Sequence, residues 1–422
     1  MITSKEREYL RELAKRYSEL AHADINEKKR KNWYAINDLS GAAKPVFINH
    51  YWPLALNEIL PQNSYKCQDQ TARQFESYLK TKMFYSKELE DDNVLEPVIY
   101  SQQVFGLEDY EGLERKIERT DNDTDESGAY AMVPVIVEDS DIEKLRMPKL
   151  TYDKETTRLN YEQAYDIFHP ILTVLKKPHT MAAKIADEFS WFRGMENTYM
   201  DMYDEPEWMH AALRKITDNF KARFRMLEDA GIWGTLDNSE PLGSAGLRYA
   251  TGIPDFRDVE DPFTHKVKLR DSWGFTCAEV FNCVSNAMHD EFSYAYDKEV
   301  MSLFKYINVG CCEVLDHKID LIRGLNNARK ISVSEWCDVE HAADAIKGDY
   351  VYSYRAAGVH FVNDRWDKEN AEKEIRSVLT ASKKHGCNTE IVLNIGGTLG
   401  RHPVEKVKEW SKMVRGLINE YY

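Results

Sequence analysis

The sequence lacks any apolar run near the roughly 20 residues that a membrane helix needs, and its start is charged from residue 5 onward. It is also short of positive charge, because 56 Lys and Arg face 71 Asp and Glu and leave a net charge of -15. Such a balance repels phosphate backbones and anionic lipid surfaces. We therefore predict a cytoplasmic protein with neither a nucleic acid nor a membrane as partner.

Cysteine is scarce as well, with seven residues in the 422 of the chain. The number is odd, and Cys311 and Cys312 are adjacent, which is poor geometry for a disulfide framework, so we expect reduced thiols. Aromatic residues are plentiful, with 24 Tyr, 16 Phe and 9 Trp. The length and the apolar content predict a globular protein, built as one large barrel-type domain or as two smaller domains.

The first third of the chain is irregular. Thr3 and Glu6 form a capping-box pattern that opens an amphipathic helix, and KPVFINHYW (44–52) is typical of a buried strand. We predict that residues 1–130 form an N-terminal helix, the first strand and an irregular extension packed on the rest. Residues 131–422 are expected to complete a single domain.

From residue 158 onward, helical and strand-like segments alternate without a linker. The strand-like segments after the first lie at 179–186, 232–238, 271–277, 306–314, 330–336, 349–355 and 389–395. This alternation indicates a parallel sheet with helical crossovers, and eight such units predict an α/β protein of the (β/α)8 TIM-barrel class. A doubly wound open sheet is the alternative, although no glycine-rich dinucleotide turn follows the first strand.

In a barrel, the functional side chains follow the carboxyl ends of the strands. Three potential metal ligands, Glu313, Glu335 and His360, fall at three consecutive strand ends. A catalytic zinc takes three protein ligands and keeps one open position, so we predict that these residues bind zinc and that Glu313 and Glu335 are catalytic. Cys312 and Cys337 are competing ligands. The alternative is that the acids are ion-paired rim residues and the cysteines small buried side chains.

The sequence also predicts a substrate pocket formed by residues near the strand ends. Trp191, Trp273 and Trp336 would wall it, Asn238 would supply a polar group, and Arg355 could hold an anionic part of a substrate. For each tryptophan, packing in the core is the alternative.

Several segments resemble a known family. ARKISVSEWCDVEHAADAIKGDYVYSYR (328–355) and SNAMHDEFSYAY (285–296) resemble the uroporphyrinogen decarboxylase superfamily. GCCE (310–313), LDNSEPLGSAGLRY (236–249) and WFRGMENTYMDM (191–202) resemble its divergent bacterial branch. The resemblance extends over roughly residues 130–420 and implies the same barrel.

The resemblance also separates two activities. Porphyrinogen decarboxylases carry an arginine-rich segment after the first strand, whereas INHYWPLALNEILP (48–61) has no arginine, and Gly397 replaces their usual late histidine. The other branch contains zinc-dependent methyltransferases that work with corrinoid proteins. Their thiol-methylating pattern would fall on Gly310, Cys312, Glu335 and Gly397 and is incomplete. The Glu, Glu, His pattern of the O-demethylase members would be filled by Glu313, Glu335 and His360.

These observations predict a methyltransferase, either a monomer or a homodimer. It would move a methyl group from a small O-methyl donor, with methoxylated aromatics as one class and N-methyl donors as another, to the Co(I) corrinoid of a partner protein. Zinc would activate the leaving oxygen. The chain has no corrinoid-binding Asp-x-His-x-x-Gly motif, so a corrinoid protein is the expected partner. The alternatives are a lyase that acts on a smaller carboxylate held by Arg193, Arg248 or Arg355, and a non-catalytic barrel.

Overall fold

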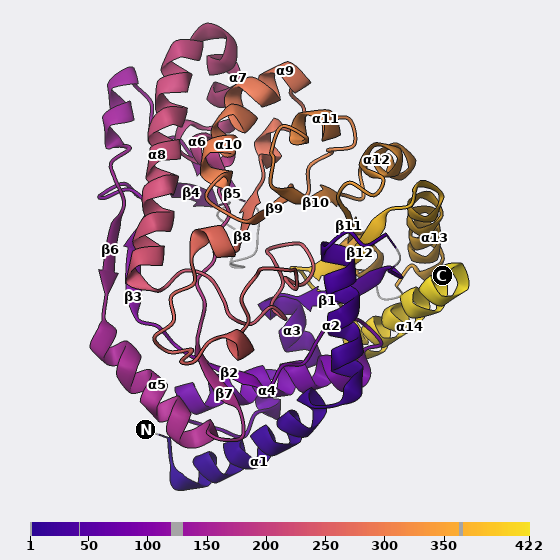
Figure 1. Ribbon diagram of the computed structural model, residues 1–422. Helices are drawn as coiled ribbons and strands as arrows, with labels where there is room; N and C mark the ends of the chain where they lie inside the picture. Colours follow the sequence, from indigo (N-terminus) through magenta and orange to yellow (C-terminus); the bar gives the residue numbers. More distant parts are fainter. Residues whose placement is uncertain (1, 42, 120–129, 363–365) are drawn as a thin grey trace.

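The computed structural model of the chain describes residues 2–41, 43–119, 130–362 and 366–422. Its centre is a curled parallel sheet of six strands in the order β1-β12-β11-β10-β9-β8 (Figure 1). The strands are β1 (Val46–Tyr51), β8 (Trp273–Thr276), β9 (Tyr306–Val309), β10 (Ala328–Val333), β11 (Val351–Ala356) and β12 (Asn388–Ile395). Every position of β11 is buried, and β1 and β12 are each buried at all but one, so this part of the sheet is covered on both faces.

The register aligns the strand ends. Tyr51 of β1 pairs with Ile395 of β12, and Thr276 of β8 pairs with Val309 of β9. Because all six strands are parallel, the loops that follow them leave the sheet at the same edge. The residues that follow the strands therefore lie along one edge of the sheet.

Helices cover the sheet and continue around it. The crossovers between the later strands are made by α12 (Val339–Ile346) and α13 (Lys368–His385), and α14 (Pro403–Tyr421) follows β12. The helices before them are α5 (Lys154–Phe168), α6 (Ile185–Arg193), α7 (Met195–Asp204), α8 (Pro206–Ala230), α9 (Asn286–His289), α10 (Ala295–Met301) and α11 (Ile319–Ile322). A π-helical turn, Asp290–Tyr294, separates α9 from α10. The sequence also predicts helices at 205–230 and 368–385, between the strand-like segments, and α8 and α13 confirm both almost to the residue.

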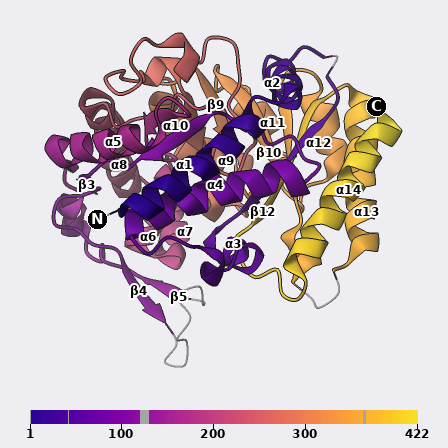
Figure 2. The same ribbon diagram turned by 90° about the horizontal axis from the view of Figure 1, so that it is seen from below.

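The N-terminal part is helical, with α1 (Ser4–Ala21), α2 (Asp24–Asn37), α3 (Pro53–Ile59) and α4 (Gln70–Glu88). The predicted capping box is present, since Thr3 and Glu6 exchange side-chain and backbone hydrogen bonds. Seen from below, α1 and α4 run side by side (Figure 2). The extension also carries two antiparallel pairs, β3 (Phe105–Glu108) with β6 (Lys149–Tyr152), and β4 (Lys116–Arg119) with β5 (Tyr130–Val133).

The predicted closed ring of eight strands is not formed by the described residues. β2 (Val98–Ser101) pairs only with β7 (Thr173–Lys176), and the remaining wall is joined by single bridges between His179 and Trp233 and between Ala183 and Thr276. The positive φ of Gly234, 80°, turns the chain after one bridge and prevents a longer strand. The chain is therefore a mixed α/β protein with a barrel-like, incompletely paired wall.

The strand predicted at 179–186 is wrong in its position. The regular strand β7 lies earlier, and Ile185 already begins α6. The apolar run continues into this helix because one face of α6 is core: Ile185, Ala186, Phe189 and Phe192 are all buried. A short apolar run of this kind fits a strand or a buried helix equally well.

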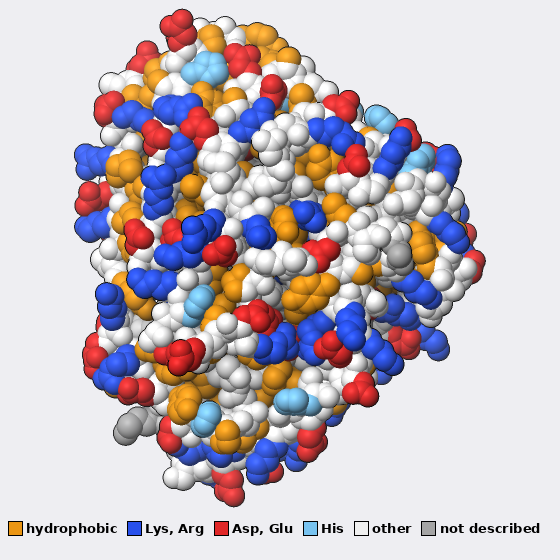
Figure 3. Space-filling model, in the orientation of Figure 1, with side chains coloured by type: hydrophobic (Ala, Val, Ile, Leu, Met, Phe, Trp, Pro, Cys, Tyr) orange, Lys and Arg blue, Asp and Glu red, His pale blue; other side chains and the backbone are white. Residues whose placement is uncertain are grey.

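The surface is mixed in charge. Figure 3 shows lysine and arginine side chains interspersed with aspartate and glutamate over the face seen in Figure 1. Within the described ranges, no helix combines the length and the apolar character that crossing a membrane would require.

Candidate functional site

Two cysteines and a glutamate meet at the carboxyl edge of the sheet. Cys311 and Cys312 follow β9, and Glu279 begins a short 3-10 turn after β8. Their ligand atoms all lie within 4.8 Å of one another, and the two sulfur atoms are 3.5 Å apart. This set, called the thiol-carboxylate group below, is the one cluster of three metal-ligand side chains that the described part of the chain contains.

The turn that presents the cysteines depends on Gly310. Its φ is 88°, and a Cβ atom at this position would lie 2.3 Å from a methyl carbon of Leu315. An L-residue would meet both a strained backbone and a steric clash. The glycine therefore lets the chain reverse directly after β9, so that Cys311 and Cys312 lie beside the loop from β8.

Glu313 holds this turn in place from below. Its Oε1 accepts the amide of Ala278 at 2.8 Å, and its Oε2 accepts the amide of Cys311. Glu313 is 2% exposed. Burial raises the pKa of its carboxyl group, and the two hydrogen bonds from the backbone lower it by less. Both oxygens are thus engaged by backbone, which makes Glu313 a positioning residue for the group.

The thiols of Cys311 and Cys312 form a hydrogen bond with each other, and this bond shifts their pKa values in opposite directions. The bond to Cys312, followed by burial, raises the pKa of Cys311, whereas the same bond lowers the pKa of Cys312. The exposed Cys312 is therefore the first of the pair to become a thiolate. The Ser244 side chain acts in the opposite direction and lowers the pKa of Cys311.

Lys184 and Asp187 connect the group to a cavity. Lys184 Nζ lies 3.7 Å from Glu279 Oε1 and 4.0 Å from Asp187 Oδ2. Burial lowers the pKa of Lys184, but the acidic side chains around it, Cys277, Glu279 and Asp187 among them, outweigh burial and raise it. Burial raises the pKa of Asp187 to about 6. Lys184 therefore stays a cation beside the carboxyl group of Glu279.

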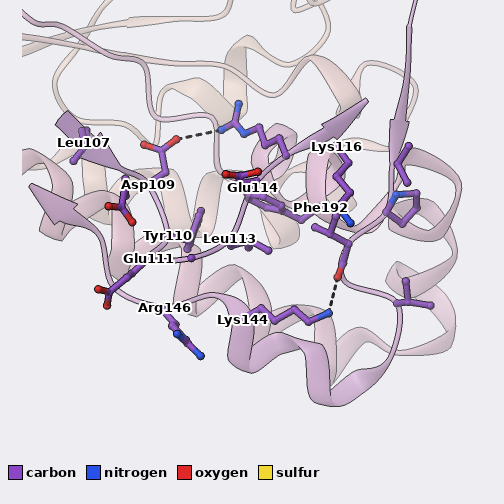
Figure 4. Close-up of a pocket in the computed structure, with 17 residues that line it drawn as sticks. Leu107, Asp109, Tyr110, Glu111, Leu113, Glu114, Lys116, Lys144, Arg146 and Phe192 are labelled. Atoms are coloured by element: carbon purple, nitrogen blue, oxygen red, sulfur yellow. Dashed lines mark hydrogen bonds and ion pairs between the residues drawn. The ribbon is translucent and has the colours of Figure 1, made fainter. Parts of the chain in front are cut away.

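The cavity beside Lys184 has a volume of about 460 Å³ and is also lined by Asp187, Trp191 and His179. It shares Leu107, Asp109 and Arg115 with a second, larger cavity of about 970 Å³. Figure 4 shows the larger cavity, with the labelled side chains of Asp109 and Tyr110 on one side and Lys144 on another. Lys184 thus lies both in the wall of the smaller cavity and next to Glu279 of the thiol-carboxylate group.

The sequence-predicted ligands Glu313, Glu335 and His360 are not brought together as one set. His360 Nε2 lies 2.7 Å from Glu374 Oε2, whose other oxygen accepts the hydroxyl of Tyr354. Glu335 is close enough to this pair to interact with both members. Burial raises the pKa of Glu335, Glu374 raises it further, and His360 lowers it. Glu313 belongs to a different loop, the turn after β9, where it binds the backbone amide of Cys311.

Of the two competing cysteines, only Cys312 belongs to the thiol-carboxylate group. Cys337 is buried, and its sulfur lies 3.8 Å from the carbonyl oxygen of Glu313. Burial raises the pKa of Cys337, with the Ser334 hydroxyl opposing this. Cys337 therefore packs as a small neutral side chain behind the turn.

The predicted pocket residues are spread over different environments. Trp191 lines the smaller cavity, whereas Trp273 is buried and donates its indole N–H to the carbonyl of Arg248 at 2.8 Å. Trp336 is 72% exposed. Asn238 is buried and donates to the carbonyl of Pro254. Trp273 and Asn238 thus pack in the interior, and Arg355 is buried on β11.

Sequence reasoning missed Glu279, Cys311 and Lys184 as site residues. The signal for Glu279 was its place directly after the strand 271–277, to which the strand-end rule applies as it does to Glu313. Cys311 lay inside the quoted GCCE motif. Lys184 carried no signal, because it fell inside the segment interpreted as a strand.

No family model matches the chain, and no curated protein sequence matches it. Among solved structures, a methyltransferase from Methanosarcina mazei is similar with a TM-score of 0.49 and 11% identity, covering 93% of this chain and 99% of that chain. The resemblance to the uroporphyrinogen decarboxylase superfamily stays a prediction.

Proposed function

We propose that the protein is a zinc-dependent methyltransferase that takes a methyl group from a small methylated donor, an O-methyl compound in the first instance, for the Co(I) corrinoid of a partner protein. The observation that carries the proposal is the thiol-carboxylate group at the carboxyl edge of the sheet. In this proposal Glu279, Cys311 and Cys312 take the place of the ligand set predicted from the sequence.

The donor set fits zinc. Zinc, a borderline ion, accepts both soft thiolate and hard carboxylate ligands, and three protein ligands leave a fourth position open, as in catalytic rather than structural sites. Glu279 and Cys312 are exposed and Cys311 is half-buried, so the group faces the solvent side of the strand ends. Zinc, when bound, would supply Lewis acidity that stabilises negative charge on a leaving oxygen.

The neighbouring side chains position the thiol-carboxylate group and set its charge. Glu313 fixes the backbone of Cys311, Lys184 places a cation 3.7 Å from the Glu279 carboxyl oxygen, and the shared hydrogen bond makes Cys312 the more acidic thiol. The cavity next to Lys184 provides space for a small donor, with Trp191 in its wall. An aromatic wall next to a few polar groups is typical of small-molecule sites.

The metal test uses protein that is purified free of metal, reconstituted with zinc and analysed for its elements. About one zinc per chain is expected, as for a single three-ligand site. Cys312→Ser and Glu279→Ala should each lose the metal. Cys283→Ser is the matched control, because Cys283 is also exposed but lies outside the group. Zinc near zero, or equal zinc in the Cys312 and Cys283 variants, would contradict the proposal.

The transfer test uses a candidate corrinoid protein reduced to Co(I), whose absorbance is followed after a panel of methoxyl and methylamine donors is added. Loss of the Co(I) spectrum and gain of the methyl-Co(III) spectrum should require this protein, zinc and donor together. If zinc binds but no donor changes the spectrum, the lyase or the non-catalytic alternative replaces the proposal.

A further inference from the structure

Arg355 is a buried cation without an ion pair in the described ranges of the chain. Its side chain is 6% exposed on β11. Nη1 donates to the carbonyl oxygen and the hydroxyl of Ser353 at 3.1 and 2.6 Å, and Nε donates to the Ser244 hydroxyl at 3.3 Å. The second terminal nitrogen, Nη2, is buried and has no hydrogen-bond partner among the described residues.

The nearest buried acid is already engaged by another cation. Glu390 Oε2 accepts Lys330 Nζ at 2.6 Å, and both side chains are fully buried. Its Oε1 accepts the amide of Gly246 at 3.0 Å and the hydroxyl of Ser353. Lys330, Arg355 and Glu390 therefore place two positive charges against one negative charge in the interior of the protein.

Such an excess of charge is costly to keep. Moving an ion out of water costs several kcal/mol unless it is paired, and accordingly burial lowers the pKa of Arg355. A guanidinium stays charged at any pH near neutrality, so it cannot escape the cost by losing its proton. Its free N–H therefore represents a binding capacity that the folded chain leaves unused.

The guanidinium lies next to the thiol-carboxylate group. Ser353, whose hydroxyl accepts from Arg355 Nη1, pairs across β10 and β11 with Ser332, and the Ser332 hydroxyl donates to the carbonyl oxygen of Cys311 at 2.7 Å. Ser244, whose hydroxyl accepts from Arg355 Nε, is half-buried in the loop before β8.

Building on the proposed function, we propose that the methyl donor carries a carboxylate and that Arg355 binds this carboxylate through Nη2. The methyl-bearing end of the donor then lies at the thiol-carboxylate group. A hydrogen bond between a guanidinium and a carboxylate is charge-assisted and is stronger than a neutral one. A neutral analogue leaves Nη2 buried and unpaired, and sites of that kind reject such analogues strongly.

The competing explanation is structural. Arg355 could instead balance the negative charge of the two thiolates and Glu279 once a metal is bound. In that case its removal would release zinc, and the charge of the donor would have no influence on binding. The two explanations therefore differ in two separate measurements.

The experiment is calorimetric titration of the zinc-loaded protein with 4-methoxybenzoate and methoxyacetate, each compared with its neutral amide. Each acid should bind at least about tenfold more tightly than its amide, because a hydrogen bond to a charged group contributes roughly 1.5–3 kcal/mol. Arg355→Met should abolish this difference and keep its zinc, and Arg355→Lys should restore part of it.

Arg193→Met is the control for loss of an arginine, because Arg193 is paired with Asp201 on α6 and α7. It should bind the acids as the parent protein does. Equal affinity of acid and amide in the parent overturns the proposal, and so does loss of zinc from both Arg355 variants. Selective binding of the acids without methyl transfer would contradict the proposed function and leave the assignment of Arg355 intact.

Discussion

Glu313 binds the backbone amide of Cys311, two residues before it, and so closes the turn that carries both cysteines. Its other oxygen accepts the amide of Ala278, next to Glu279. One buried side chain thus joins the two loops whose residues form the thiol-carboxylate group.

Replacing Glu313 should weaken both the fold and metal binding. In Glu313→Gln one backbone amide faces an NH₂ group instead of an oxygen, and a buried donor without a partner costs about 1–3 kcal/mol. Urea denaturation should show a loss of this size, and zinc affinity from chelator competition should fall. Glu335→Gln is the control and should keep its zinc. Equal zinc affinity in both variants would show that Glu313 does not position the group.

Gly310→Ala should disturb the same turn through the backbone. The positive φ alone costs an L-residue roughly 1–2 kcal/mol, and the contact with Leu315 adds to this. Thermal unfolding should report the destabilisation. Gly396→Ala provides the comparison, because no atom lies within 4 Å of its added Cβ. A Gly310 variant as stable as the Gly396 variant would exclude this account.

Removing one partner of the buried ion pair between Lys330 and Glu390 should strongly lower the free energy of unfolding. Both side chains are fully buried, with Lys330 Nζ 2.6 Å from Glu390 Oε2, so Glu390→Gln leaves the buried Lys330 without its carboxylate, at a cost of about 3–5 kcal/mol. The exposed pair of Lys15 and Glu12 supplies the contrast, since Lys15→Met should cost at most about 1 kcal/mol. Chemical denaturation of the two variants tests the difference, and similar values would refute it.

Asp297 should make stability depend on pH. Burial raises its pKa to about 7, although the hydroxyls of Ser293 and Thr276 lie close to its oxygens. The unfolded chain ionises Asp near pH 4. Between about pH 4 and 7 the folded state therefore holds the extra proton, and stability falls as pH rises, by up to about 1.4 kcal/mol per pH unit.

Asp297→Asn removes this titration. The free energy of unfolding of the variant, relative to the parent, should rise steadily from pH 4 to pH 7, as measured by denaturation at several pH values. A constant difference across this range would mean that Asp297 titrates normally in the folded protein.

The sequence predicted the later βα units well because each has a long amphipathic helix with clear ends. The helix at 368–385, for example, begins after Asp367, which caps it, and ends at Gly386 in the left-handed conformation. The early wall was harder, because the apolar run around Ile185 suits a strand and a buried helix equally. Gly234 also takes a positive φ of 80° directly after the bridge at Trp233, which extended strand backbone does not have.

The sequence pointed to the edge of the sheet at which the thiol-carboxylate group lies, but not to its members. Only Cys312 was among the predicted ligands. The partners of each side chain could not be predicted: His360 is bound to Glu374 and Glu313 to backbone amides, and both contacts depend on tertiary packing. Glu279 was overlooked for the same reason, since its neighbours come from a different loop.

The single bridges at His179 and Ala183 give the two sides of the site different rigidity. The cysteines follow β9, which is paired with β8 over four residues and with β10 on its other side. The segment that carries Lys184 is attached to the sheet at isolated positions, such as the bond from the Ala183 amide to Phe275. Substitutions in the cavity wall should therefore be tolerated far more readily than substitutions behind the cysteines. A protein built in this way can change the donor it accepts while its metal-binding turn stays fixed.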